Sequence, residues 1–255
     1  MLNIVIPMAG AGSRFANAGY KDPKPLIPVG GVPMIKLVLE NLRPSQPHRF
    51  IFIAQAAHIA TYGLNDRLAR WAPRSVVIGI DRLTEGAACT VLQAREHIDS
   101  DEPLMIANSD QYVDTPIDEY LALILERGFD GLIMTMTAHD PKWSFVEFGT
   151  DRMVRRVVEK EVISDEATVG IYNFARGGDF VRAADAMIAA DERVNGEFYV
   201  APVYNRLIAQ GAHVGLSNIG AEACGMYGLG IPADLDLFHS LPVCSRAVAV
   251  AAARP

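Results

Sequence analysis

The chain has 255 residues, of which 50% are hydrophobic and 21% charged, the proportions of an ordinary globular protein with one large domain. Its 30 acidic residues outnumber the 23 basic ones and give a net charge of −7, which argues against an extended nucleic-acid surface, because such a surface needs clustered Lys and Arg. The apolar start of the chain is too short to span a membrane and lacks the basic region of a signal peptide. The three cysteines, Cys89, Cys224 and Cys244, have no metal-ligand spacing and cannot all pair, so we expect a cytoplasmic protein without disulfides or a zinc site.

Strands and helices alternate over the first part of the chain. The run Leu2–Met8 is continuously apolar, which predicts a strand buried on both faces. Further strands are predicted at residues 49–54, 75–80, 103–107 and 131–137. Apolar residues at helical spacing predict helices at residues 34–42, 65–71, 87–97 and 116–127. This alternation is typical of an open, mainly parallel α/β sheet, in which ligands bind beyond the carboxyl ends of the strands.

The pattern changes in the second part of the chain. Three strands, at residues 145–148, 153–159 and 169–174, follow one another with only turns between them, which predicts a partly antiparallel extension of the sheet. The remaining predicted elements are helices at 179–190 and 203–210, a strand at 214–217 and a C-terminal helix from Ala233. The final VAVAAARP is short and apolar, so we expect a tail or a contact between subunits, as in a homodimer.

A glycine-rich turn, MAGAGSRF, follows the first predicted strand. Gly10 and Gly12 have no Cβ atom, so the backbone can turn sharply and bring its N–H groups close to an anion. Arg14 and Lys24 add positive charge, and two prolines flanking Lys24 stiffen its loop. The Walker sequence is absent, and a phenylalanine occupies the third glycine position of the dinucleotide fingerprint. The turn therefore favours a phosphate site of another type over a dinucleotide site or a plain strand-to-helix turn.

The whole segment, from the glycine turn through Pro-Lys-Pro at 23–25 to PVGGVPMI, resembles the nucleotidyltransferase (nucleotide-sugar pyrophosphorylase) family. The resemblance implies a Rossmann-like nucleotidyltransferase fold over nearly the whole chain, with a mixed, mostly parallel sheet flanked by helices and a small antiparallel extension for the acceptor. It implies that an NTP and a phosphorylated acceptor give an NDP-linked product and pyrophosphate, with Mg²⁺ as cofactor. We expect one domain over 1–255, with an NTP-binding half at 1–137, an acceptor-binding half at 138–232 and a C-terminal helix and tail at 233–255.

The resemblance also implies which residues bind the nucleotide. Ala9 and Gly10 would line the base, and Lys24 would bind the leaving pyrophosphate. The triphosphate would contact the turn residues Gly12, Ser13 and Arg14. A second stretch of small residues would hold the base from the other side, namely Gly86, Ala87 and Ala88. Without the family, close packing of a helix on the sheet explains that stretch equally well.

Asp110 is the candidate metal ligand, in the sequence Asn-Ser-Asp-Gln directly after a predicted strand. A carboxylate beside a triphosphate suits Mg²⁺, although an Asp that caps a helix is the simpler alternative from the residues alone. Relatives often carry a second Asp ligand where this chain has Gly228. Either Asp110 binds Mg²⁺ with phosphates and water, or Glu222 or Asp234 replaces the lost ligand; Asp234 is also placed to begin the last helix.

The acceptor half departs from the family pattern at two points. Ser144 stands where sugar-activating relatives carry the glycine of an aromatic-glycine pair, and Glu159-Lys160 is followed by Glu in place of Pro. The resemblance implies that Lys160 binds the acceptor phosphate and that the other acceptor contacts are Ser144, Glu159, Gly170 and Glu197. From the residues alone, an exposed Glu-Lys pair is more typical of a solvated surface.

The segments LTEGAACTV, NSDQ, DPKWSF and EKEVISDEATVGIYNF resemble those of a branch found among capsule and surface-polysaccharide genes. Some members of that branch use CTP and phosphoglutamine. Ser144 and the missing second Asp favour this reaction over sugar-1-phosphate uridylyl or thymidylyl transfer, which stays open. Arg14, Lys24, Asp110 and Lys160 would act in catalysis by positioning and charge neutralisation. The scattered histidines support no catalytic triad. A non-catalytic nucleotide-binding regulatory module is the alternative from another class.

Overall fold

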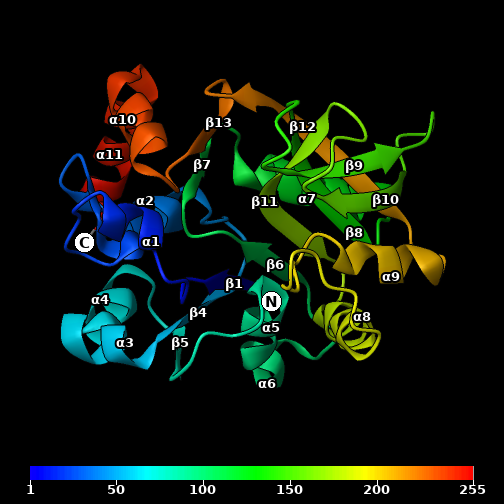
Figure 1. The fold of residues 1–255 in the computed structure, drawn as a ribbon, viewed down its shortest axis with the longest axis horizontal. Helices are drawn as coiled ribbons and strands as arrows, with labels where there is room; N and C mark the ends of the chain where they lie inside the picture. Colours follow the sequence, from blue (N-terminus) through cyan, green and yellow to red (C-terminus); the bar gives the residue numbers. More distant parts are fainter. Residues whose placement is uncertain (255) are drawn as a thin grey trace.

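The computed structural model describes residues 1–254, in which eleven strands form one mixed sheet (Figure 1). The strand order is β5-β4-β1-β6-β11-β8-β12-β13-β7, with β9 added to β11 and β10 added to β9. These strands are β1 (Leu2–Pro7), β4 (His48–Gln55), β5 (Val76–Ile80), β6 (Leu104–Ala107), β7 (Gln111–Val113), β8 (Gly131–Thr137), β9 (Ser144–Phe148), β10 (Val154–Glu159), β11 (Glu166–Phe174), β12 (Val214–Glu222) and β13 (Gly225–Gly228). A separate small hairpin is formed by β2 (Pro28–Val29) and β3 (Val32–Pro33).

Helices cover both faces of the sheet. One face packs against α2 (Met34–Asn41), α4 (Leu64–Trp71), α7 (Ile117–Arg127), α10 (Pro232–Ser240) and α11 (Pro242–Ala253). The other face packs against α5 (Ala87–Val91), α6 (Arg95–Ile98), α8 (Gly177–Ala189) and α9 (Val203–Ala209). The remaining helical segments are α1 (Ser13–Asn17), α3 (Ala56–Tyr62) and the 3₁₀ turns η1 (Lys24–Leu26) and η2 (Leu92–Ala94).

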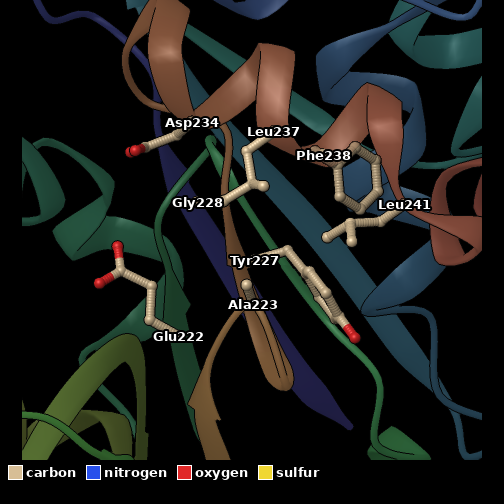
Figure 2. A pocket seen from close by; sticks show the side chains of 8 residues that line it. All are labelled: Glu222, Ala223, Tyr227, Gly228, Asp234, Leu237, Phe238 and Leu241. Carbon is tan, nitrogen blue, oxygen red and sulfur yellow. The ribbon is translucent and has the colours of Figure 1, made fainter.

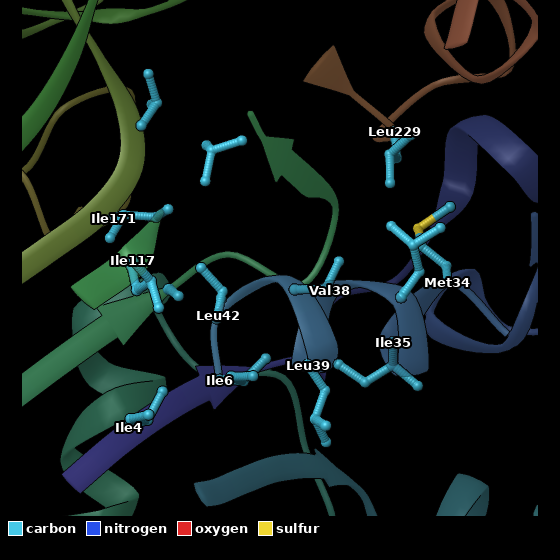
Figure 3. Close-up of a cluster of buried hydrophobic side chains, with 14 of the residues drawn as sticks. Ile4, Ile6, Met34, Ile35, Val38, Leu39, Leu42, Ile117, Ile171 and Leu229 are labelled. Carbon is cyan, nitrogen blue, oxygen red and sulfur yellow. The ribbon is translucent and has the colours of Figure 1, made fainter. Parts of the chain in front are cut away.

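Strand β1 shows why its apolar run forms a central strand. Ile4 and Ile6 point into the core under α2, whereas Val5 points into the core on the opposite face, because side chains of a strand alternate. Figure 3 shows Ile6 close to Val38 and Leu39 of α2. β1 pairs in parallel with β4 and β6, and β4 with β5, so the predicted parallel sheet is confirmed.

The antiparallel extension is also confirmed. β11 lies between β6 and β8 and runs antiparallel to both. β9 and β10 form an antiparallel hairpin, which joins β11 at the pair Ala167 and Phe145. Figure 1 shows β9 and β10 at the opposite end of the molecule from α10 and α11.

Two predicted helices are divided in the structure. The helix expected at 87–97 consists of α5, the 3₁₀ turn η2 and α6. The helix expected from Ala233 breaks before Pro242, where Leu241 adopts an extended backbone, because a proline disfavours the helical conformation in the residue before it. The resulting α10 and α11 are bent by 92°. No single helix within residues 1–254 has the length and apolar character needed to cross a membrane; only this bent pair, taken together, has them.

The C-terminal segment expected to be a tail or a subunit contact belongs to α11. This helix packs on α2, and Val248 lies against Gly30 between β2 and β3. Lys36 donates a hydrogen bond to the carbonyl of Arg254, whose guanidinium pairs with Glu40. Within the described chain, this segment therefore covers the core.

Candidate active site

Three adjoining cavities open at the carboxyl ends of β1, β5 and β6, where the predicted motifs lie. The glycine-loop cavity has an empty volume of about 560 Å³ and is lined by Pro7, Met8, Gly10, Gly12, Lys24, Pro25, Asn108, Ser109 and Asp110. The Thr84 cavity, of about 790 Å³, is lined by Pro7, Ala9, Gly10, Ala11, Ile80, Leu83, Thr84, Gly86, Ala87, Thr90, Asn108 and Glu197. The Trp143 cavity, of about 710 Å³, is lined by Ala87, Asn108, Asp110, Gln111, Lys142, Trp143, Ser144, Glu159, Thr168, Gly170, Tyr172, Tyr199, Val200 and Ala201.

The glycine turn after β1 contributes to two of these cavities. Gly12 has a φ of 63°, a left-handed conformation that favours glycine, and begins helix α1. The carbonyl of Ala9 accepts a hydrogen bond from Gln55 at 3.0 Å, which fixes the turn against the end of β4. Ser13 and Arg14 stand exposed on α1, beside the lining residues.

Lys24 and Asp110 meet across the glycine-loop cavity. Lys24 Nζ lies 2.7 Å from Asp110 Oδ2. The side chain of Lys24 is 25% exposed and that of Asp110 is 20% exposed. Asp110 stands between β6 and β7, so it does not cap a helix, which removes the simpler explanation of this residue. A Cβ on Gly230 would lie 2.5 Å from Asp110 Oδ2, so only glycine leaves room for the carboxylate there.

The small residues after β5 are held against a distant loop. Gly86 has a φ of 129°, and a Cβ at this position would collide with the backbone of Phe198. Phe198 donates a hydrogen bond to the Glu85 carbonyl at 2.8 Å and accepts one from Ala88 at 3.0 Å. Gly86 and Ala87 line the Thr84 cavity, whereas Ala88 is buried behind them.

Asp234 and Glu222 are the two acids that could complete a metal site with Asp110. Asp234 Oδ2 lies 2.9 Å from the place of a Cβ on Gly228, so its carboxylate, from the first turn of α10, occupies space that a side chain at 228 would need. Figure 2 shows both carboxyl groups on one side of Gly228, with Tyr227 and the apolar residues on the other. Glu222 already pairs with Lys142 at 2.8 Å.

The pKa of Asp234 depends in part on Asp110, which lines the glycine-loop cavity. Burial raises the pKa of Asp234, the charges of Glu222 and Asp110 raise it further, and Lys142 and Arg14 oppose this shift. No cluster of three or more His, Cys, Asp or Glu side chains suited to a metal occurs within residues 1–254. Two carboxylates, with oxygens from phosphates and water, still fit the preference of Mg²⁺ for few protein ligands.

Known proteins resemble this chain in sequence and in fold. A family model described as nucleotidyl transferase matches residues 4–198, which include Lys24, Asp110 and the small residues after β5. The chain belongs to the nucleotidyl transferase family. Asp234 and Glu222 lie beyond the matched part of the chain.

Proteins with similar sequences include two that are named GlmU. A bifunctional protein GlmU from Burkholderia multivorans is 26% identical over 225 residues, 84% of this chain and 46% of its own length. The GlmU of Cupriavidus metallidurans is 25% identical over 257 residues, 96% of this chain and 53% of its own. The chain therefore spans about half the length of the curated relatives it matches.

Solved structures show the same fold. A nucleoside-diphosphate-sugar pyrophosphorylase from Vibrio cholerae superposes with a TM-score of 0.81 at 25% identity, covering 93% of this chain and all of its own. An inositol-1-phosphate CTP transferase from T. maritima superposes with a TM-score of 0.73 at 14% identity, covering 97% and 95% of the two chains. The predicted Rossmann-like nucleotidyltransferase fold is confirmed.

Three residues predicted to contact the acceptor line the Trp143 cavity: Ser144, Glu159 and Gly170. The Ser144 hydroxyl donates a hydrogen bond to the buried carboxylate of Glu159. Burial raises the pKa of Glu159, partly offset by the bond from Ser144 and the charge of Lys160. The fourth predicted residue, Glu197, lines the Thr84 cavity instead.

Lys160 lies beside the Trp143 cavity and not in its wall. Its Nζ donates a hydrogen bond to the hydroxyl of Tyr199 at 2.6 Å, and Tyr199 itself lines the cavity. This bond raises the pKa of Lys160, so the side chain stays positively charged at neutral pH.

Several lining residues were not predicted as site residues. Asn108 lines all three cavities, and Gln111, Lys142, Trp143 and Tyr199 line the Trp143 cavity. Asn108 and Gln111 flank Asp110 at the end of β6, and that position was the available signal for them. Trp143 precedes Ser144 in the stretch that corresponds to the aromatic-glycine pair, which was the available signal for it. Lys142 and Tyr199 line the cavity through tertiary packing.

Proposed function

We propose that this chain transfers a nucleotidyl group from an NTP, with CTP favoured, to a small phosphorylated acceptor and releases pyrophosphate. The observation that carries the proposal is the Lys24–Asp110 pair in the glycine-loop cavity, because Asp110 also lines the Trp143 cavity and the nearby Asn108 lines all three cavities. A triphosphate beside the glycine turn, a base in the Thr84 cavity and an acceptor in the Trp143 cavity would place the α-phosphorus near Asn108 and Asp110.

The proposed reaction is an in-line displacement. An oxygen of the acceptor phosphate forms a bond to the α-phosphorus while the bond from that phosphorus to the bridging oxygen breaks, and pyrophosphate leaves with the electron pair. A phosphate monoester is ionised at neutral pH, so the chain needs no general base for this step. Catalysis then depends on positioning and on charge neutralisation.

The residues have separate proposed roles. Lys24 would bind the leaving pyrophosphate and Arg14 the triphosphate, with backbone contacts from Gly12 and Ser13. Ala9, Gly10, Gly86 and Ala87 would enclose the base, with Ala88 supporting them from behind. Lys160 would bind the acceptor phosphate once released from Tyr199, while Ser144, Glu159, Gly170 and Glu197 would surround the rest of the acceptor.

Asp110 and Asp234 are the side chains that we propose to hold Mg²⁺. Asp234 is preferred over Glu222 because it takes up the space beside Gly228 and makes no ion pair within residues 1–254, whereas Glu222 is paired with Lys142. When bound, the ion neutralises negative charge on the phosphates. Asp110, next to Gly230, and Asp234, next to Gly228, would hold the ion.

CTP and a phosphoglutamine-type acceptor, used for capsule or surface-polysaccharide building blocks, are the favoured substrates. Support comes from the motifs of that branch, from Ser144 in place of glycine and from Gly228 in place of Asp. The T. maritima protein of the same fold is a CTP transferase by name. The second candidate is sugar-1-phosphate uridylyl or thymidylyl transfer, favoured by the likeness to the V. cholerae nucleoside-diphosphate-sugar pyrophosphorylase.

A matrix of NTPs and acceptors, assayed by pyrophosphate release, tests the proposal. CTP, UTP, dTTP and ATP are each combined with phosphoglutamine, glucose 1-phosphate and N-acetylglucosamine 1-phosphate in the presence of Mg²⁺. The proposal expects the highest kcat/KM with CTP and phosphoglutamine. A higher value for UTP or dTTP with a sugar phosphate supports the second candidate, and NTP binding without any pyrophosphate supports a regulatory module instead.

A further inference from the structure

Two polar atoms in the wall of the Trp143 cavity have no hydrogen-bond partner. Gln111 Oε1 and Trp143 Nε1 are both buried, and neither bonds to another group within the part of the chain that the structure describes. A buried polar atom without a partner destabilises the folded state, because it has lost its bonds to water. Such atoms in a cavity wall indicate that the missing partner is a ligand.

The surroundings of Gln111 hold its amide in place. Gln111 is 9% exposed and is the first residue of β7, directly after Asp110, where it pairs with Gly228 of β13. Its Oε1 lies against Gly170, whose φ is 80°, and a Cβ at 170 would collide with this oxygen. The bare glycine therefore leaves room for an amide that forms no bond within the described chain.

Trp143 is fixed from two directions. Its carbonyl accepts a hydrogen bond from the backbone of Lys160 at 3.0 Å, and Lys142 Nζ lies 4.9 Å from the centre of its ring. The next residue, Ser144, donates to Glu159. The cavity wall thus offers a free N–H on Trp143, a free oxygen on Gln111 and the Glu159 carboxylate.

We propose that Gln111 and Trp143 determine acceptor specificity by bonding the part of the acceptor that does not carry the phosphate. Trp143 Nε1 donates to an acceptor oxygen, and Gln111 Oε1 accepts from a hydroxyl or an N–H group. The substrate class is a phosphate monoester whose carbon skeleton carries both kinds of group, such as a hydroxylated sugar or a primary amide. This inference rests on the proposed function, in which the Trp143 cavity takes the acceptor.

Both atoms have almost no exposed surface, so an acceptor reaches them only after a small movement of the cavity wall. The alternative is a structural role, in which each polar group supports the fold. The two roles differ in the free protein. Removing an unpaired polar atom leaves stability unchanged or raises it, whereas removing a paired one lowers it.

The test uses Trp143→Phe and Gln111→Met, which keep most of the side-chain volume and remove the polar atom. Ser75→Ala is the matched control, because Ser75 Oγ is also buried without a partner but lies outside the three cavities. The measurements are the Tm of the free protein, the Tm shift caused by phosphoglutamine or by glucose 1-phosphate, and the KM values for acceptor and NTP.

The expected result is a Tm at or above that of the wild type for Gln111→Met and Ser75→Ala, whereas the smaller ring of Trp143→Phe lowers the Tm through lost packing. Trp143→Phe and Gln111→Met should raise the acceptor KM about tenfold and reduce the acceptor-induced Tm shift, with the NTP KM changed by less than about twofold. Ser75→Ala should leave both KM values and the acceptor-induced Tm shift unchanged. Comparing the two acceptors shows whether the sugar or the amide compound makes the bonds.

A lower Tm of free Gln111→Met, or an unchanged acceptor KM in either cavity variant, would overturn the inference. If wild-type protein releases no pyrophosphate with any acceptor, the proposed function fails, but the Tm measurements still decide the inference. In that case, a shift given by either acceptor to the wild type and lost in both variants supports it. The absence of a shift from both acceptors overturns it.

Discussion

Lys24 and Asp110, which are 86 residues apart in the chain, form an ion pair with a distance of 2.7 Å between Nζ and Oδ2. One residue comes from the loop after β1 and the other from the end of β6, and these strands are hydrogen-bonded neighbours. The parallel pairing brings the two strand ends together, as open α/β sheets do. The pair therefore joins the glycine turn to the candidate metal ligand.

Replacing Lys24 by Ala should lower kcat by about 100- to 1000-fold, because one positively charged donor to the leaving pyrophosphate is lost. Both members of the pair are partly exposed, so the Tm should change by only a few degrees. Pyrophosphate release and thermal unfolding measure the two effects. Lys21→Ala, on the same loop, is the control and should retain activity; full activity of Lys24→Ala would remove Lys24 from the mechanism.

Asp234→Asn should weaken divalent-metal binding about tenfold, whereas Glu222→Gln should change it by less than about twofold. The difference follows from the place of Asp234 beside Gly228 and from the pairing of Glu222 with Lys142. Binding of Mn²⁺ in the presence of a non-hydrolysable CTP analogue, followed by electron paramagnetic resonance, measures this without turnover. The opposite order of the two variants would assign the second ligand to Glu222.

The raised pKa of Glu159 predicts a pH-dependent contribution to stability. Burial is the main cause, and the ordinary value is 4.5. Between 4.5 and the raised value, the folded state binds more protons at this carboxyl than the unfolded state does. Its contribution is thus fully present below pH 4.5 and is lost as the pH rises through the folded-state pKa.

Urea unfolding of wild type and Glu159→Gln over a pH series checks this prediction. The free energy of unfolding of the wild type, relative to the variant, should fall as the pH rises from about 4.5 towards neutrality. A relative stability that increases over this range would mean that the carboxyl has a lowered pKa.

Gly170→Ala should destabilise the protein by about 2–4 kcal/mol and raise the acceptor KM. The φ of 80° disfavours a side chain, and a Cβ would also collide with the amides of Asn108 and Gln111. Gly211→Ala is the matched control, because Gly211 has a similar φ of 86° but open space around it. The control should lose about 1–2 kcal/mol in urea unfolding; equal losses in both variants would show that the collision is relieved.

The sequence predicted the parallel half of the fold well, because strands such as β1 and β4 are buried on both faces and read as continuous apolar runs. Strands β7 and β13 were missed. Gln111–Val113 and Gly225–Gly228 are short and contain polar or glycine residues, so neither carries a periodic signal. The two strands pair antiparallel beside Asp110, with Gln111 opposite Gly228. They are far apart in the chain, so local sequence does not predict this pairing.

For the candidate site, the sequence indicated the residues at strand ends and not their distant partners. Gly86 was expected to contact a base, but its contact with Phe198 could not be inferred from the chain. Likewise, Asp234 was expected to begin a helix and lies in the first turn of α10, which begins at Pro232. Its place beside Gly228 depends on how α10 packs on β13. The roles proposed for Gln111 and Trp143 rest on buried polar atoms without a hydrogen-bond partner, which only the structure reveals.

The most direct test of the proposed cytidylyl transfer follows the phosphorus atoms of CTP. Wild-type protein is incubated with Mg²⁺, phosphoglutamine or a sugar 1-phosphate, and CTP labelled at either the α- or the γ-phosphorus. The proposed reaction predicts the α-label in the new product and the γ-label in pyrophosphate. A γ-label in the product, or no labelled product from any acceptor, would contradict it.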